Sequence, residues 1–259
     1  MNDKINLTKN NGIAIITINR PKNRNALDSE SINEFANVVA FVEADKTTQV
    51  IVLTGGGGTF CAGADLNEIL DLGSSYQPWA GADGPLSKHC SKPVIAAIEG
   101  HAVAGGLGLA LWADIRVASE TAIFGVYCRR FGIPMSDGTP TRLPLIVGRS
   151  RALDMLLTGR PIDAKEAFRI GLADRKVAGG SALKEAIALA KQISIFPTLA
   201  MQADRATAWA AFDSDETTLL KEESSRAQTA KLADAADGAA RFKNGLGRGG
   251  NIISENFPK

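Results

Sequence analysis

Hydrophobic residues alternate along the first part of the chain and then change their spacing. The run 12–18, GIAIITI, alternates as a strand does, and Arg20-Pro21 ends it because proline cannot donate to a strand ladder. After Asp28, a favoured helix cap, apolar residues recur at helical spacing until a short buried strand at 50–53. The pattern therefore predicts the order β-β-α-β.

Two later segments repeat one pattern, in which a buried strand enters a glycine-rich turn and then a helix. The first has its turn at 54–66 and a short helix from about Asp65. The second has a strand at 93–98, a turn at 99–108 and a helix at 107–113 that is apolar all round, which is typical of a central helix. Such turns leave backbone N–H groups free at a helix start, where they attract negative charge.

Beyond the second unit the pattern becomes mainly helical. We expect short strands at 114–118 and 122–125, followed by helices at 150–157, 163–170 and 181–195, the second of them after an aspartate cap at Asp163. From Pro197 onward the chain reads as alanine-rich helix with few large apolar groups, so this part is expected to pack on another surface, a neighbouring subunit being one candidate. We therefore predict a core at 1–196 and a helical C-terminal region at 197–259.

Charge and cysteine content narrow the class of protein. Lys and Arg number 29 against 28 Asp and Glu, and this balance favours neither a nucleic acid nor an anionic membrane surface as partner. No stretch approaches the roughly 20 apolar residues that span a bilayer, so we expect a soluble, cytoplasmic protein. Cys61, Cys90 and Cys128 are widely spaced and are interpreted as reduced thiols, without a metal site.

Several common catalytic patterns are absent from the sequence. Neither glycine-rich turn continues into the Lys-Ser or Lys-Thr of a P-loop, and the segment from Gly106 supplies only two of the three glycines of a dinucleotide fingerprint. No serine has the flanking glycines of a hydrolase elbow. His89 is interpreted as a solvated cation at a helix end. His101, in the second turn, is interpreted as a residue that positions this loop, with a role in the chemistry as the alternative.

The two turns and their surroundings resemble one family closely. The matching residues are 60–66 (FCAGADL), 92–119 (KPVIAAIEGHAVAGGLGLALWADIRVAS), 20–21 (RP), 25–27 (NAL), 143–148 (LPLIVG), 157–164 (LTGRPIDA) and 171–173 (GLA). They resemble the crotonase superfamily, also called the enoyl-CoA hydratase/isomerase family, over 13–177.

The resemblance implies an α/β fold, the ClpP-like spiral of repeated β-β-α units, with a helical C-terminal region that forms trimers or dimers of trimers. It places an oxyanion hole for the thioester carbonyl of an acyl-CoA at the backbone N–H groups of Ala64 and Gly105. It also assigns substrate-binding positions to Arg24, near the CoA phosphates, and to four residues of the two turns: Ala62, Asp65, Leu66 and Gly106. No cofactor beyond the CoA moiety of the substrate is implied. The segment 74–86, which carries Tyr76 and Trp79, resembles the variable segment of the family that shapes the floor of the acyl pocket.

Hydration uses two glutamates, one that deprotonates the attacking water and one that protonates the α-carbon. The sequence departs from the family at both positions. Aligned without gaps, these positions fall on Gly108 and Cys128. Other members carry an aspartate in the following loop, at a position that falls on Ser136. We therefore predict Asp137, one residue later, as the acid/base group, with capping of a helix at 139–147 as its competing or additional role.

Three hypotheses about function stay open at this point. The first is an acyl-CoA enzyme of hydratase/isomerase type that works through an enolate. The second is a member with another enolate reaction, such as an isomerase, decarboxylase or hydrolase. The third is a catalytically silent acyl-CoA-binding protein.

Next to Cys128 stands a pair of arginines, Arg129-Arg130. One arginine of this pair is expected to neutralise a nearby carboxylate.

Overall fold

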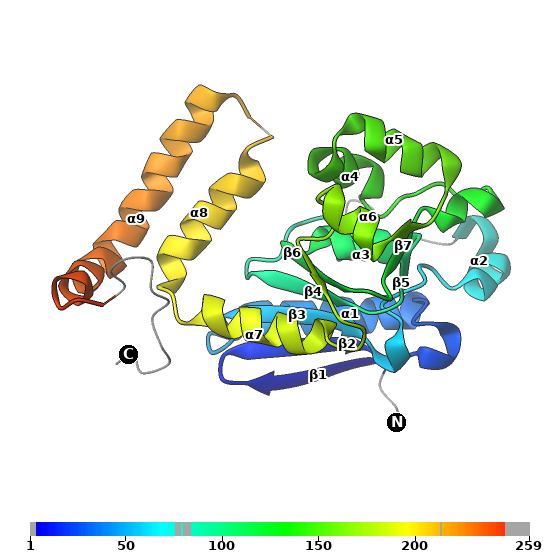
Figure 1. Cartoon of the computed structure of the whole chain (residues 1–259), viewed down its shortest axis with the longest axis horizontal. Coiled ribbons are helices and arrows are strands. Elements are labelled where there is room, and N and C mark those ends of the chain that lie inside the picture. The colour runs from blue at the N-terminus through cyan, green and yellow to red at the C-terminus, as the bar shows by residue number, and fades with distance from the viewer. Residues whose placement is uncertain (1–3, 76–78, 80–83, 213, 247–259) are drawn as a thin grey trace. The chain divides into compact units, whose positions relative to one another are not determined.

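The structure is a computed structural model that describes residues 4–75, 79, 84–212 and 214–246. It divides the chain into two units, residues 1–190 and 191–259. The first unit is an α/β fold built on two sheets, and the second consists of helices (Figure 1).

The larger sheet has six strands in the order β1-β2-β3-β4-β6-β9. They are β1 (Ile5–Asn10), β2 (Ile13–Ile18), β3 (Val50–Gly55), β4 (Val94–Ile98), β6 (Ile115–Ser119) and β9 (Arg175–Val177). The first two strands form an antiparallel hairpin, and each later pair is parallel. The smaller sheet is formed by β5 (His101–Val103), β7 (Ile123–Gly125) and β8 (Ile162–Asp163).

Helices connect the strands and cover the sheets. Those of the first unit are α1 (Ser29–Ala44), α2 (Leu66–Leu72), α3 (Gly105–Trp112), α4 (Thr139–Val147), α5 (Arg149–Thr158), α6 (Ala164–Arg169) and most of α7 (Ala182–Ser194). The second unit contains α8 (Thr198–Ala210) and α9 (Glu216–Lys243). In the view of Figure 1, helix α7 is drawn in front of strands of the large sheet.

Aspartates cap four of these helices, α1, α2, α6 and α9, the last through Asp215. The caps of α1 and α6 were predicted from the sequence. The Asp28 carboxylate accepts a hydrogen bond from the Ser31 N–H at 2.9 Å, and Asp163 caps α6 in the same way through Glu166 at 2.7 Å. Asp65 caps α2 through Asn67. Each cap satisfies one of the N–H groups that a helix start leaves without an intrahelical partner.

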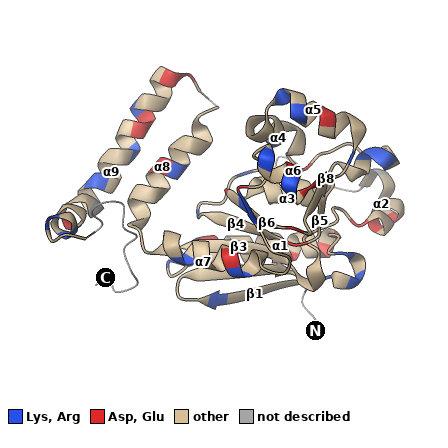
Figure 2. Ribbon diagram, in the orientation of Figure 1, with Lys and Arg blue, Asp and Glu red and all other residues tan. Residues whose placement is uncertain are grey.

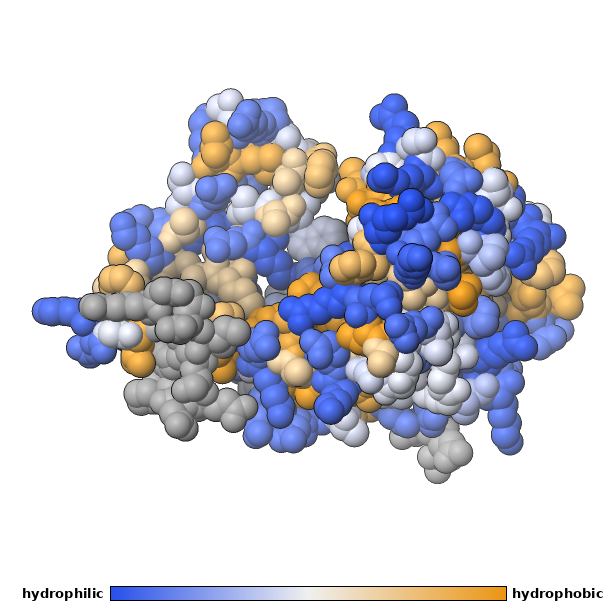
Figure 3. Space-filling model, viewed as in Figure 1, coloured by the Kyte–Doolittle hydropathy of each residue, from blue (hydrophilic) through white to orange (hydrophobic). Residues whose placement is uncertain are grey.

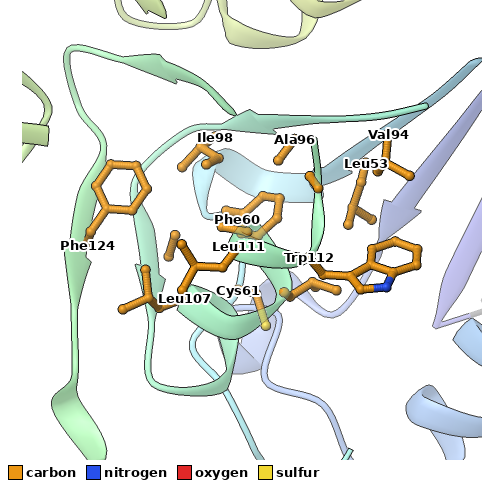
Figure 4. Packing of buried hydrophobic residues seen from close by; sticks show 14 of the residues in the cluster. Leu53, Phe60, Cys61, Val94, Ala96, Ile98, Leu107, Leu111, Trp112 and Phe124 are labelled. Carbon is orange, nitrogen blue, oxygen red and sulfur yellow. The ribbon is translucent and has the colours of Figure 1, made fainter. Parts of the chain in front are cut away.

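Helix α3 lies at the centre of the core, as its all-round apolar sequence predicts. Every residue after Gly105 in this helix is buried. The cluster in Figure 4 gathers Leu107, Leu111 and Trp112 of α3, Val94, Ala96 and Ile98 of β4, and Leu53, Phe60, Cys61 and Phe124. From Gly106 onward, α3 is therefore held in place by close packing.

Two details of the second turn differ from the expectation. Helix α3 begins at Gly105 rather than Leu107, and the segment 99–108 contains the strand β5, in which His101 lies. The expectation of a plain turn was wrong because β5 is only three residues long and its partner, β7, lies some 20 residues later in the chain. His89 was also misplaced: no helix is present at 84–92, and the residue is half-buried.

The second unit is a pair of helices, α8 and α9, with mixed charges and apolar groups on their surface. Figure 2 shows basic and acidic residues interspersed along α9. Figure 3 shows hydrophobic residues on the surface of the pair. Those with large exposed side chains are Leu199, Leu220, Leu232 and Phe242. Among the described residues, no helix is both long enough and apolar enough to span a membrane.

Candidate active site

The two glycine-rich turns meet side by side in the structure. The Cys61 N–H donates to the His101 carbonyl at 2.9 Å, and the Val103 N–H donates to the Cys61 carbonyl at 3.1 Å. Only glycine fits at Gly106, because a Cβ there would lie 2.0 Å from the Cys61 carbonyl oxygen. A Cβ on Gly63 would likewise come within 2.9 Å of the Gly105 nitrogen. The turns that the sequence separates by 40 residues thus share one surface.

The backbone around Ala64 leaves its N–H group facing that surface. Leu27 pairs with this segment by donating to the Gly63 carbonyl at 2.8 Å and accepting from the Asp65 N–H at 2.9 Å. Because successive peptide groups of an extended segment point in opposite directions, the Ala64 N–H points away from Leu27. Within the described chain this N–H has no hydrogen-bond acceptor, and Ala64 lines the adjoining cavity.

Gly105 presents the second free N–H group. It is the first residue of α3, and the N–H groups of a first helical turn have no intrahelical acceptor. The residue before it, Ala104, has φ 49° and ψ −128°, a conformation that costs a non-glycine residue about 1–3 kcal/mol. A hydrogen bond from the Ala104 N–H to the Gly125 carbonyl at 2.9 Å holds this turn in place. The strained residue therefore fixes the direction of the Gly105 N–H.

A cavity of about 330 Å³ adjoins both N–H groups. Its lining is mostly apolar, and six of the eight predicted site residues belong to it: Arg24, Ala62, Ala64, Leu66, Gly105 and Asp137. The lining also contains Ile69, Trp79, His101, Val103, Ala104, Tyr127, Cys128, Phe131, Ile133, Pro134, Met135 and Ser136.

The other two predicted residues, Asp65 and Gly106, support the turns and are not part of this lining. The Asp65 carboxylate caps α2 and accepts from the Arg20 guanidinium at 3.0 Å, so its side chain is already used within the protein. Gly106 packs against Cys61 as described above.

Asp137 brings a carboxyl group into this cavity while also holding the start of a helix. The side chain is 6% exposed, and its Oδ1 accepts from the Thr139 N–H at 3.0 Å, at the first residue of α4. Burial raises the pKa of Asp137, and the hydrogen bonds from Thr139 only partly oppose that rise. The N-cap residue of α4 is Gly138, one residue after the predicted Asp137. Asp137 nevertheless binds the first N–H group of the helix, which is compatible with a position for chemistry.

The carboxyl group of Asp137 lies directly over Gly108. A Cβ on Gly108 would be 2.5 Å from Asp137 Cγ and 2.8 Å from Oδ1, which is far closer than two such atoms can approach. Gly108 is in the first half of α3, so the carboxylate enters the space that any side chain at this position would occupy. The missing side chain at Gly108 thus makes room for Asp137.

Cys128 lines the same cavity but is a poor base. Its side chain contacts the Met135 sulfur, and burial raises the pKa of the thiol, with the nearby Asp137 carboxylate adding to the rise. The neighbouring arginines do not neutralise a carboxylate among the described residues, contrary to the expectation. Arg129 donates to the Leu156 carbonyl, and Arg130 donates to the Gly159 carbonyl and lies over the Tyr127 ring.

Tyr127 lines the cavity although no motif in the sequence marks it. It reaches the same cavity as Trp79 and His101, from a third segment, and no spacing in the chain predicts that the three residues come together. Trp79 lies in the segment 74–86, which was expected to shape the acyl pocket. Tyr76, singled out in the same segment, lies outside the described residues.

Comparison with known proteins identifies relatives over most of the chain. The family model described as enoyl-CoA hydratase/isomerase matches residues 8–246. An enoyl-CoA hydratase of Mycobacterium tuberculosis is 39% identical over 198 residues, covering 73% of this chain and 74% of that protein. A crotonyl-CoA hydratase of Syntrophomonas wolfei is 36% identical over 211 residues, which cover 80% of this chain and 81% of that protein. The crystal structure of an enoyl-CoA hydratase from Mycobacterium marinum matches with a TM-score of 0.88 at 30% identity, covering 94% of this chain and 96% of that one.

Proposed function

Because the chain belongs to the enoyl-CoA hydratase/isomerase family, the crotonase superfamily, we propose that it binds an acyl-CoA thioester and moves a proton on the acyl group through an enolate. One observation carries this proposal. The buried carboxyl group of Asp137 lines the same cavity as the two turns whose Ala64 and Gly105 N–H groups have no acceptor in the described chain.

The two N–H groups would receive the thioester oxygen. Negative charge develops on that oxygen when a proton leaves the neighbouring carbon, and fixed backbone donors stabilise it without having to reorganise. Removing one such donor costs enzymes about 2.7–4 kcal/mol of transition-state stabilisation. The close packing around α3 and the strained turn at Ala104 keep the Gly105 donor in place.

Asp137 would carry the proton. A carboxyl group is most effective as an acid/base when its pKa is moved towards the working pH, and burial moves that of Asp137 upward. Asp137 is also the single carboxylate among the described residues that line the cavity. One carboxyl group suffices to take a proton from one carbon and return it to another, whereas hydration also requires a base for water. This favours a proton shift within the acyl group over hydration.

The CoA moiety would extend from the cavity along the first turn. Arg24 is exposed at the cavity mouth and supplies a cation for phosphate, while Ala62 and Leu66 line the path. Asp65 and Gly106 would act indirectly, by fixing the two turns against each other.

The test is a turnover screen with purified protein. Crotonyl-CoA, 3-enoyl-CoA, branched enoyl-CoA, dienoyl-CoA and hydroxyacyl-CoA are incubated in deuterated water, and the products are analysed by mass spectrometry and chromatography. We expect double-bond migration or deuterium exchange next to the carbonyl. Binding of acyl-CoA without product or exchange would instead establish a silent binding protein and contradict the enzyme proposal.

A further inference from the structure

We propose that Trp79 determines which acyl groups the protein accepts, by forming a rigid wall beside the carbonyl-binding N–H of Gly105. The inference rests on the proposed function, since it assumes that an acyl-CoA thioester is bound at this N–H. It adds a specificity-determining residue to the site and does not depend on which proton is moved.

The contact between Trp79 and Gly105 is close. A Cβ on Gly105 would lie 2.8 Å from both Cη2 and Cζ3 of the Trp79 ring and 3.3 Å from Cζ2. The six-membered part of the indole therefore packs against the backbone of the residue that presents the N–H group. Trp79 is 4% exposed and lines the cavity. The ring thus limits the space next to the point where a bound thioester carbonyl would sit.

Hydrogen bonds through Leu86 connect the Trp79 carbonyl to α4, the helix that follows Asp137. The Leu86 N–H donates to the Trp79 carbonyl at 3.5 Å, and the Leu86 side chain is 1% exposed. Arg142 of α4 in turn donates to the Leu86 carbonyl. These contacts connect the wall to the element that begins at Asp137, so the proposed proton carrier and the wall are held by one framework.

A fixed aromatic wall selects among acyl groups by shape. Tryptophan is the largest side chain in the lining, and its two rotatable bonds let it fill space at little entropic cost. Each methylene that an apolar pocket admits or rejects changes discrimination by about 10- to 200-fold. Replacing the ring with a small side chain should therefore shift preference towards groups with more bulk near the carbonyl.

The experiment compares affinities for saturated acyl-CoAs, which bind without requiring turnover. Dissociation constants for CoA, acetyl-CoA, butanoyl-CoA, 2-methylpropanoyl-CoA and octanoyl-CoA are measured by calorimetry for the wild type, Trp79→Ala and Trp79→Leu. Trp209→Ala is the control, because Trp209 lies in α8 and is not part of the lining. We expect both Trp79 variants to improve binding of the branched or longest acyl group relative to acetyl-CoA by at least tenfold, with CoA itself unchanged.

One outcome would contradict the role of Trp79, and another would contradict the proposed function. If the affinity ratios of a folded Trp79 variant equal those of the wild type and of Trp209→Ala, Trp79 is not a specificity residue. If the wild type binds no acyl-CoA more tightly than CoA, the proposed function itself fails. Trp79→Leu retains an apolar side chain in the cavity, so it serves as the test variant if Trp79→Ala does not fold.

Discussion

At the scale of single residues, Gly108 and Asp137 depend on each other for space. The carboxyl group is placed 2.5 Å from where a Cβ on Gly108 would stand, so the position must stay without a side chain. A glycine inside a helix ordinarily costs about 0.8–1.0 kcal/mol relative to alanine, and here that cost creates the volume for a buried acid. The effect of a substitution at Gly108 should therefore depend on which residue is present at position 137.

Alanine at Gly108 should lower the free energy of unfolding by about 1–3 kcal/mol, because the methyl group overpacks against Asp137. The matched control is Gly238→Ala in α9, where the nearest atom to a new Cβ, in the Arg241 side chain, is 3.8 Å away. The control should stabilise by up to about 1 kcal/mol through helix propensity. Urea denaturation measures the free energy of unfolding of both variants. The double variant Gly108→Ala with Asp137→Ala should be more stable than Gly108→Ala alone. Equal effects at the two glycines would contradict the shared-space argument.

Replacing Asp137 with asparagine should reduce turnover by about 100- to 10,000-fold while leaving CoA affinity nearly unchanged. Asparagine keeps the oxygen that accepts from the Thr139 N–H, so the start of α4 should persist. Ser136→Ala, which alters the adjacent lining residue, is the control and should retain most of the activity. Steady-state kinetics with calorimetry separate the two effects, and unchanged turnover in Asp137→Asn rules out the acid/base role.

The raised pKa of Asp137 also predicts a pH dependence. Its folded-state value lies above the ordinary 3.8, so the folded protein binds the proton more tightly than the unfolded chain does. Stability from this group is present below pH 3.8 and is lost as pH rises through the folded-state pKa. Asp137→Asn should therefore be more stable than the wild type at neutral pH. If Asp137 acts as the base, kcat/KM should rise with pH through a pKa above 3.8.

Residues of the proposed site differ in how far the sequence reveals them. Ala64, Gly105 and Asp137 lie in motifs that resemble the family, and all three line the cavity. Trp79 and Tyr127 come from segments without such a motif, and their meeting depends on the tertiary packing of several elements. Asp65 was placed in the substrate path, but its carboxylate is engaged by Arg20 and by the start of α2.

At the scale of elements, the Glu99 carboxylate joins parts of the chain that are some 80 residues apart. It accepts from the Ala182 N–H at 3.0 Å and the Gly180 N–H at 3.1 Å, at the beginning of α7, and from the Thr121 hydroxyl at 3.1 Å. The sequence offers no sign of this, because a glutamate in a turn is ordinarily solvated. The side chain therefore holds the start of α7 against the segment that contains Glu99 and Thr121.

Glu99→Gln should lower the free energy of unfolding by about 1–3 kcal/mol, because hydrogen bonds to a charged acceptor are replaced by weaker ones. The control is Glu120→Gln, which removes only an exposed pairing with Lys176 and should leave the urea midpoint unchanged. An equal midpoint for both variants would show that Glu99 does not hold α7.

The same carboxylate predicts a stability change in acid. Burial alone would raise the pKa of Glu99, but hydrogen bonds from the Ser119 side chain and from the Ala182 and Gly180 backbone hold it below 4.5. Its contribution is present above the unfolded value and is lost as pH falls through the folded-state pKa. Between neutral pH and pH 3 the wild type should therefore lose more stability than Glu99→Gln does.

The predicted crotonase fold is confirmed, and the elements show why so much of it could be predicted. Helices α1 and α6 begin at the aspartates that the sequence marks as caps, and α3 is buried as its apolar composition requires. Strand β5 was missed because three residues carry too little periodicity and the strand is defined by β7 and Cys61, which are distant in sequence.

At the scale of the whole molecule, the exposed apolar residues of α9 suggest a surface for a second copy of the chain. Leu232 is 80% exposed and Phe242 is 60% exposed, and burying such apolar side chains against a second copy would be favourable. We expect assemblies of three or six chains of 27.3 kDa by light scattering. Leu232→Glu should reduce the assembly size, whereas Leu157→Glu on α5, 73% exposed in the first unit, should not. A wild-type mass of one chain would contradict this expectation.

The contact between the two turns has a consequence for the stage of folding at which the protein becomes able to bind its substrate. Ala64 and Gly105 are 41 positions apart, and their turns are joined by the bonds between Cys61 and the strand β5. Forming a pairing between segments so far apart in the sequence is slow compared with forming a helix, because the entropy of the intervening loop must be lost before the stabilising contacts can form. During refolding, helical circular dichroism should recover first, and the ability to bind a thioester should return only with this later closure. A nascent chain ending before residue 105 would carry half of the proposed oxyanion hole and no capacity to bind.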